Sequence, residues 1–217
     1  MGIKVKICGI KTIPQLDATI KGKAYMVGLM FYDKSPRYIN IKVAIKLSKH
    51  AGSKIKKVGV VANMNYLKIK EILEKVNLDF LQFHGEETPE FLNNIKKEFK
   101  VKIIKSVKII NKNDLKILNT YKKVSDFLLL DSKNIKKNGR YKPLSKSKKI
   151  NFNLIKNLSN KKHLILSGAL NNNNLEKITK FTKMGFVDVS SSLENISGTK
   201  SIKKITNFLK IASKLKV

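Results

Sequence analysis

Residues 57–83 read KVGVVANMNYLKIKEILEKVNLDFLQF, and this stretch decides the fold because it holds one complete repeat of the chain. It begins with a β-branched run at 57–62, continues with a polar segment of helical period at 67–75, and ends in a second apolar run at 80–83. Short β-branched runs predict strands, and an apolar period of 3.6 residues predicts a helix. The stretch therefore predicts a strand, a helix and a strand in succession.

The same alternation extends over the whole chain. The expected strands are 5–8, 26–31, 57–62, 80–83, 102–107, 127–131, 163–167 and 186–190. The expected helices are 13–21, 41–50, 67–75, 89–99, 114–121, 153–158, 175–181 and 201–215. Eight strands that are each followed by a helix predict the α/β class and a single eight-stranded parallel (β/α)8 TIM barrel, with residues 1–217 as one domain. An open doubly wound sheet is the alternative, but residues 8–12 lack the glycine-rich phosphate turn that usually follows its first strand.

Composition limits the class of protein. The hydrophobic fraction of 42% suffices for a core, so a disordered chain is excluded. We expect neither a membrane span nor a signal peptide, because no run of eighteen apolar residues and no leader pattern at 1–11 is present, and we expect a cytoplasmic protein. A single cysteine, Cys8, excludes an intrachain disulfide and a multi-cysteine metal site, and with three scattered histidines we expect no structural zinc site.

The charge is strongly positive. Forty-six basic and fifteen acidic residues give a net charge of +31, a balance that normally indicates a nucleic-acid partner. Only Arg37 and Arg140 are arginines, the lysines are spread along the chain, and aromatic residues make up 7%, too few for a base-stacking surface. We therefore expect a solvated surface that attracts small anions and no nucleic-acid partner.

Candidate site residues follow from the fold, because the active sites of such barrels lie at the carboxyl ends of the strands. The residues at those ends are Cys8, Arg37, Asn63, His84, Asp131, Ser167, Gly168, Ser190, Ser191 and Ser192. They include the only cysteine, one of two arginines and one of three histidines. Gln82 alternates onto the same strand face as His84, so both are expected to line the site. Each of four residues also has a purely structural alternative. Cys8 would be an inert buried thiol, Asp131 a solvated carboxylate, Arg37 an exposed surface arginine and His84 a core histidine.

Seven segments occur in the order and at the strand ends of a known family. They are KICGI (6–10), FYDKSPRY (31–38), VGVVAN (58–63), LQFHGEET (81–88), LLDS (129–132), LSGAL (166–170) and VDVSSSLE (187–194). Together they make the chain resemble the phosphoribosylanthranilate isomerase family of tryptophan biosynthesis. The resemblance implies an isomerase that converts N-(5-phosphoribosyl)anthranilate into 1-(2-carboxyphenylamino)-1-deoxyribulose 5-phosphate by an Amadori rearrangement, without cofactor or metal.

This reaction needs a general acid that opens the furanose ring and a general base that takes the proton from C2. The resemblance implies that Cys8 is the base, that Asp131 is the acid and that Arg37 binds the anthranilate carboxylate. An arginine kept in a lysine-rich chain also indicates planar, bidentate recognition of an anion. Asp131 must be held protonated, so we expect apolar neighbours such as Phe127 and Leu129 to raise its pKa.

Strand alternation adds one expectation about the barrel interior. Lys6 shares a face with Cys8 and should lie inside the barrel, one layer below it. A buried lysine needs a partner, and Asp188 on the neighbouring eighth strand is the candidate. We predict a Lys6–Asp188 pair, which partly cancels the help that Lys6 gives to a Cys8 thiolate.

The remaining site residues are binding residues. Asn63 is expected to form a polar wall of the substrate site. The resemblance implies phosphate binding by two turns of small residues, which let backbone N–H groups approach the anion; the turns consist of Ser167, Gly168 and Ala169, and of Ser190, Ser191 and Ser192.

The chain departs from the family at three places. Ala169 and Ser192 stand where the family usually has glycine, and residues 133–149 replace a glycine-rich loop, with only Gly139 remaining. We expect this loop to change site closure and rate and leave the chemistry intact, with Arg140 as a substitute phosphate contact.

Two other functions fit the sequence less well. Indole-glycerol-phosphate synthase would need a lysine–glutamate set and an amino-terminal extension. An impaired barrel that binds phosphate ligands or nucleic acid is disfavoured by the joint presence of Cys8, Asp131 and Arg37. The sequence leaves open whether the chain is a monomer or a homodimer.

Overall fold

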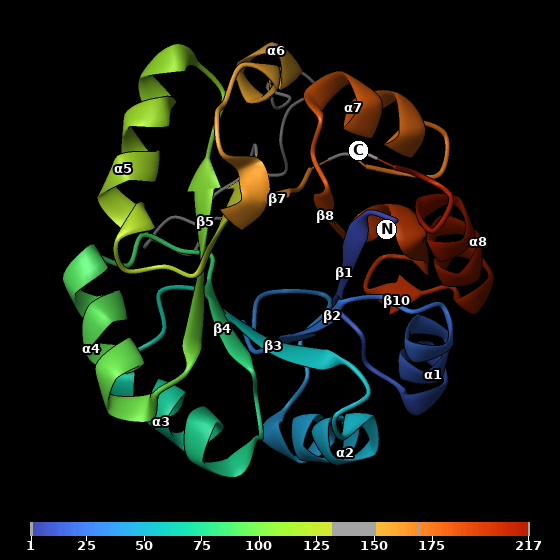
Figure 1. Cartoon of the computed structure of the whole chain (residues 1–217). Coiled ribbons are helices and arrows are strands. Elements are labelled where there is room, and N and C mark those ends of the chain that lie inside the picture. The colour runs from blue at the N-terminus through green and yellow to red at the C-terminus, as the bar shows by residue number, and fades with distance from the viewer. Residues whose placement is uncertain (1, 132–150, 169, 217) are drawn as a thin grey trace.

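A closed barrel of eight parallel strands forms the centre of the protein, and the helices lie outside it (Figure 1). The computed structural model describes residues 2–131, 151–168 and 170–216. The strands are β1 (Lys4–Cys8), β2 (Met26–Met30), β3 (Lys56–Val61), β4 (Phe80–Phe83), β5 (Lys102–Lys108), β6 (Phe127–Asp131), β7 (Leu164–Leu166) and β8 (Phe186–Val189). Each strand pairs with the next, and β8 pairs with β1, which confirms the predicted (β/α)8 barrel.

Helices follow the strands as the periodicity predicts. They are α1 (Ile13–Lys21), α2 (Ile41–Ala51), α3 (Tyr66–Lys75), α4 (Pro89–Phe99), α5 (Lys116–Lys122), α6 (Phe152–Lys156), α7 (Leu175–Thr182) and α8 (Ile202–Ala212). Polar side chains begin several of them, since Thr12, Asn40, Asn65 and Thr88 each accept a hydrogen bond from a backbone N–H of the first turn.

Two segments differ from the predicted elements. The helix predicted at 114–121 is split, because Asn111 and Asp114 cap a 3-10 turn, η1 (Lys112–Leu115), before α5 begins. A hairpin of β9 (Glu194–Ile196) and β10 (Thr199–Lys200) lies between β8 and α8, where no element was predicted. The short 3-10 helix η3 (Ser191–Leu193) connects β8 to this hairpin.

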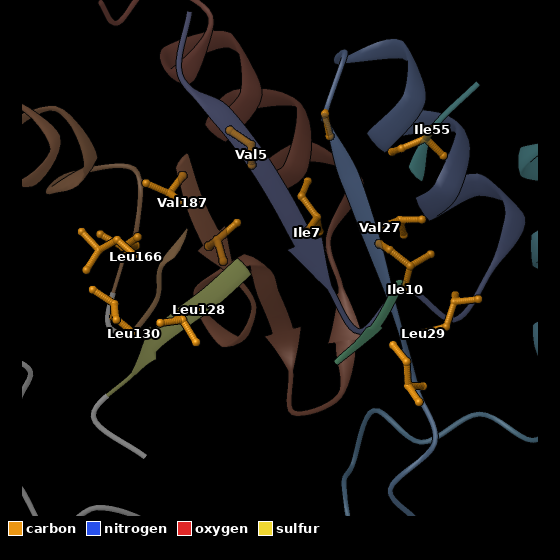
Figure 2. Packing of buried hydrophobic residues seen from close by; sticks show 14 of the residues in the cluster. Val5, Ile7, Ile10, Val27, Leu29, Ile55, Leu128, Leu130, Leu166 and Val187 are labelled. Atoms are coloured by element: carbon orange, nitrogen blue, oxygen red, sulfur yellow. The ribbon is translucent and has the colours of Figure 1, made fainter. Parts of the chain in front are cut away.

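Strand residues alternate between two apolar layers. Outward-facing side chains such as Ile7, Val27 and Val187 pack in the main core under the helices, part of which Figure 2 shows. Inward-facing side chains such as Met26 and Leu129 fill the barrel. Each layer removes apolar surface from water, which is the main favourable contribution to folding.

Aromatic rings close the amino-terminal end of the barrel interior. The Phe186 ring packs edge-on against Tyr25 and against Phe127, with 5.5 Å between ring centroids in both pairs. Phe127 also contacts Phe80 at 5.9 Å. These rings fill the space beneath the polar residues, so the hollow part of the barrel lies at the carboxyl ends of the strands.

One ion pair crosses the interior between β1 and β8. Lys6 is fully buried and donates from Nζ to Oδ1 of Asp188 at 2.8 Å, and the two residues are direct register partners. The second oxygen, Oδ2, accepts from the Ser167 hydroxyl at 3.1 Å. Burial alone would lower the pKa of Lys6, but Asp188 and Cys8 outweigh it and the pKa is raised. The predicted Lys6–Asp188 pair is confirmed.

We expect Lys6→Met to destabilise the protein by roughly 3–5 kcal/mol, because it leaves the Asp188 carboxylate buried without its cation. Urea unfolding followed by circular dichroism measures the change. Lys6→Met combined with Asp188→Leu should recover much of the loss, because the unpaired charge is then gone as well. The control is Lys180→Met, which removes an exposed lysine paired with Glu176 and should change stability by less than about 1 kcal/mol. Equal effects of the two lysine variants would contradict the expectation.

Candidate active site

A cavity of about 480 Å³ opens at the carboxyl ends of the strands. Most of the predicted site residues line it, namely Cys8, Arg37, Gln82, His84, Asp131, Ser167, Gly168, Ser190, Ser191 and Ser192. The structure also places Tyr32, Asn171 and Asp188 in its wall. Tyr32 lies inside one of the motif segments, and Asp188 lies two residues before Ser190, so sequence position offered a signal for both. Asn171 carried none.

Cys8 ends β1 and points into the barrel, where its residue surface is 5% exposed. Its register partner on β2 is Gly28, and a Cβ atom at Gly28 would lie 2.9 Å from the Cys8 sulfur. A glycine at this position therefore makes room for the thiol. The Ser190 hydroxyl donates to the Cys8 carbonyl at 3.0 Å and ties β1 to the turn after β8.

The charges around Cys8 act in opposite directions. Burial raises the pKa of the thiol, and the carboxylate of Asp188 raises it further. Nearby cations lower it by less; they belong to Lys6, Lys200 and Arg37. The thiol is consequently a weaker acid than an exposed cysteine, and its protonated form predominates at neutral pH.

Asp131 is the last residue of β6 and is 7% exposed, so it is not a solvated carboxylate. Leu129 lies two residues before it and is fully buried inside the barrel. The Nε2 atom of His84 lies 3.9 Å from Oδ2 of Asp131. Cys8 and Asp131 thus border one cavity with a histidine beside the carboxyl group.

Gln82 and His84 lie on the same face of β4, as alternation predicts, and their side chains contact each other. The Gln82 amide nitrogen is 3.2 Å from Nδ1 of His84. The other ring nitrogen, Nε2, faces Asp131. Gln82 and Asp131 therefore approach opposite nitrogen atoms of the His84 ring.

Arg37 makes a bidentate contact with a carboxylate of the protein itself. Its Nε donates to Oε1 of Glu194 at 2.6 Å and its Nη2 donates to Oε2 at 2.9 Å. The sequence indicated planar carboxylate recognition by Arg37 but not this partner. The guanidinium also lines the cavity, and the side chain is only 14% exposed, which excludes an ordinary surface arginine.

The two turns of small residues meet at the cavity. Gly168 has φ +90°, a conformation that requires glycine. Ser192 is not among the positive-φ residues, and its hydroxyl donates to the Leu170 carbonyl at 2.6 Å, so serine fits where the family usually has glycine. Ala169 lies outside the described residues, as do residues 133–149 with Gly139 and Arg140.

Asn63 does not line this cavity. It borders a neighbouring hollow of about 450 Å³, and its φ of +47° turns it away from its strand. Its backbone N–H donates to Oε1 of Glu87 at 2.7 Å, and its side-chain oxygen accepts from the Glu86 N–H at 2.8 Å. Asn63 therefore joins the loops after β3 and β4, a different place from the substrate wall that we expected.

Two further observations concern metals and membranes. Within residues 2–131, 151–168 and 170–216, no group of three or more histidine, cysteine or acidic side chains is arranged to hold a metal ion. None of the helices in these ranges combines the length and the apolar character needed to cross a membrane.

Sequence comparison relates the chain to one enzyme family. The family model described as N-(5'-phosphoribosyl)anthranilate (PRA) isomerase matches residues 5–211. The isomerase of Rhodopseudomonas palustris (strain BisB5) is 32% identical over 212 residues, which are 98% of this chain and 96% of that protein. The isomerase of Rhizobium johnstonii is 34% identical over 97% of this chain and 94% of its own length.

Solved structures agree with this relationship. The phosphoribosyl anthranilate isomerase of Thermotoga maritima superimposes with a TM-score of 0.83 and 31% identity over 98% of this chain and 100% of that chain. A phosphoribosyl anthranilate isomerase in complex with reduced 1-(o-carboxyphenylamino)-1-deoxyribulose 5-phosphate gives a TM-score of 0.82 and 30% identity with the same coverage. The chain described here belongs to the N-(5'-phosphoribosyl)anthranilate isomerase family.

Proposed function

We propose that this protein is the isomerase of tryptophan biosynthesis that converts N-(5-phosphoribosyl)anthranilate into 1-(2-carboxyphenylamino)-1-deoxyribulose 5-phosphate. One observation carries the proposal: Cys8 and Asp131 border the same cavity, which Arg37 and the two small-residue turns also line. A cysteine, a carboxyl group and an arginine supply a base, an acid and a carboxylate anchor, and membership of the family supports this assignment.

Asp131 acts as the general acid in the first step. It donates its proton to the ring oxygen of the furanose, the bond from that oxygen to C1 breaks, and the nitrogen lone pair forms the C1–N double bond of an iminium ion. Asp131 is 7% exposed and borders the cavity, so its carboxyl group can meet the ring oxygen of a substrate bound there.

Cys8 acts as the general base in the second step. Its thiolate takes the proton from C2, and the electron pair of that bond moves toward the iminium nitrogen to give an enol amine. Transfer of the enol proton to C1 then produces the ketone, so the reaction is an isomerisation of the substrate. Loss of a proton from the Cys8 thiol to solvent and uptake of one by Asp131 from solvent restore the enzyme for the next turnover. The positive iminium in the cavity favours the thiolate at the moment when it is needed.

The rest of the cavity binds the substrate. Arg37 binds the anthranilate carboxylate, and Gln82 and His84 contact the middle of the molecule. Backbone N–H groups of the turns at Ser167 and Gly168 and at Ser190 to Ser192 bind the phosphate, as small-residue turns do. Ala169 belongs to the same proposed phosphate site. Asn63 shapes the adjoining loops.

We extend the proposal to the setting of the enzyme. Residues 1–217 act as one domain in the cytoplasm, and the ligand is a small phosphorylated molecule rather than a nucleic acid. The chemistry above uses neither cofactor nor metal. Monomer and homodimer both fit a family in which monomers have been generated from the dimeric Thermotoga maritima protein.

The first test replaces the acid and the base. Asp131→Asn and Cys8→Ala should each lower kcat by roughly 100- to 10,000-fold, the usual contribution of a general acid or base. Phosphoribosylanthranilate is generated in situ, and its isomerisation is followed by anthranilate fluorescence. Asp17→Asn is the matched control, because Asp17 is an exposed carboxylate that contacts His50. Full activity of Asp131→Asn would exclude it as the acid.

The second test uses pH. Because burial raises the pKa of Cys8, the thiolate fraction should keep rising with pH beyond the ordinary thiol value of about 8.5. Thiolate absorbance at 240 nm reports this titration, with Cys8→Ala as the blank for the tyrosines, and no other cysteine interferes. The alkaline rise of kcat/KM should follow the same curve. A titration centred at or below pH 7 would contradict the role of burial.

A further inference from the structure

We propose that Glu194 on β9 is a positioning residue that holds the Arg37 guanidinium for the ring carboxylate of the substrate, and that this contact sets the selectivity for a carboxylate-bearing aromatic ring. The inference rests on the proposed function, because it uses Arg37 as the anchor of that carboxylate. The β9–β10 hairpin, which is not part of the barrel, therefore contributes to ligand recognition through Glu194.

The Glu194 carboxylate is saturated with donors. Oε1 accepts from Arg37 Nε at 2.6 Å and from Lys200 Nζ at 2.5 Å. Oε2 accepts from Arg37 Nη2 at 2.9 Å and from the Gly198 N–H at 3.0 Å. The Glu194 side chain is 5% exposed and that of Lys200 is fully buried. A carboxylate held by four donors at one place fixes the plane of the guanidinium that it binds.

Two glycines fit the surrounding backbone to Arg37. A Cβ atom at Gly9 would lie 2.7 Å from Cδ of Arg37, so the arginine stem packs directly on the residue after Cys8. A Cβ atom at Gly198 would lie 2.2 Å from the carbonyl oxygen of Pro36, so the hairpin turn is seated on the residue before Arg37. The stem of Arg37 is thus held by Gly9 and its charged head by Glu194.

The charges of the cluster favour an anionic ligand. Burial alone would raise the pKa of Glu194, but its bonds to Arg37, Lys200 and Gly198 lower it to about 2, so the carboxylate is ionised at neutral pH. Two cations and one anion leave one net positive charge on this cluster, and Arg37 is its member that lines the cavity. A planar guanidinium with five donors can bind Glu194 through one edge and a second carboxylate through another.

The test compares two ligands by isothermal titration calorimetry. One is reduced 1-(o-carboxyphenylamino)-1-deoxyribulose 5-phosphate, and the other is the same molecule without the ring carboxyl group. Glu194→Gln should weaken binding of the first ligand by roughly 10- to 100-fold, the range expected for charge-assisted hydrogen bonds. Binding of the second ligand should change by less than about 3-fold, because its contacts do not involve Arg37.

Matched variants separate positioning from general damage. Gly198→Ala keeps the carboxylate but pushes the hairpin off Pro36, and it should cause the same selective loss, which decides the question if Glu194→Gln does not fold. Gly52→Ala is its control, because Gly52 also has positive φ, at +53°, but has open space around its Cβ position. Glu176→Gln is the control for the lost negative charge. Both controls should keep wild-type selectivity.

The outcomes are distinct. Selective loss of the carboxylate-bearing ligand supports the inference. If Glu194→Gln and Gly198→Ala weaken the binding of both ligands equally, Glu194 only holds the loops together and the inference is wrong. If neither variant changes the affinity for either ligand, Glu194 has no role in binding and the inference is also wrong. If the wild-type protein turns over phosphoribosylanthranilate but binds both ligands equally, the inference fails while the proposed function stands. Absence of turnover and of binding in the wild type would overturn both.

Discussion

The ion pair between Lys6 and Asp188 is the contact on which the catalytic end of the barrel depends. It lies between the layer of aromatic rings and Cys8, and Asp188 of the pair lines the cavity. One oxygen of Asp188 holds Lys6 and the other holds Ser167, which connects β1, β7 and β8 at a single carboxylate. The two charges of the pair have opposite effects on the Cys8 thiol, because Lys6 lowers its pKa and Asp188 raises it.

Lysine is abundant in this chain, yet the buried lysines of the described residues are individually partnered. Lys105 donates to Glu87 at 2.9 Å and to the Gly85 carbonyl at 2.6 Å, and Lys200 donates to Glu194. Lys105 and Lys200 join segments at the carboxyl ends of the strands, whereas Lys57 pairs with Asp79 and the Gly52 carbonyl at the other end of the barrel. Four acidic residues, Asp79, Glu87, Asp188 and Glu194, supply the partners that these buried cations need.

The sequence predicts the barrel and most of the cavity wall because strand runs and strand ends are local patterns. It also predicts the Lys6–Asp188 pair, since neighbouring strands and alternation suffice for that. The partner of Arg37 lies 157 residues away in a hairpin of five strand residues, and no local period marks it. Asn63 follows its strand at the expected position, but its backbone is left-handed and it borders the neighbouring hollow instead of the cavity. The periodicity of the sequence does not reveal this backbone conformation.

The aromatic layer formed by Tyr25, Phe80, Phe127 and Phe186 has a consequence for traffic through the enzyme. Among the described residues, these rings fill the amino-terminal end of the barrel interior, opposite the cavity at the carboxyl ends of the strands. Substrate and product both occupy that cavity. A product molecule that stays bound therefore excludes the next substrate, so the product should act as a competitive inhibitor.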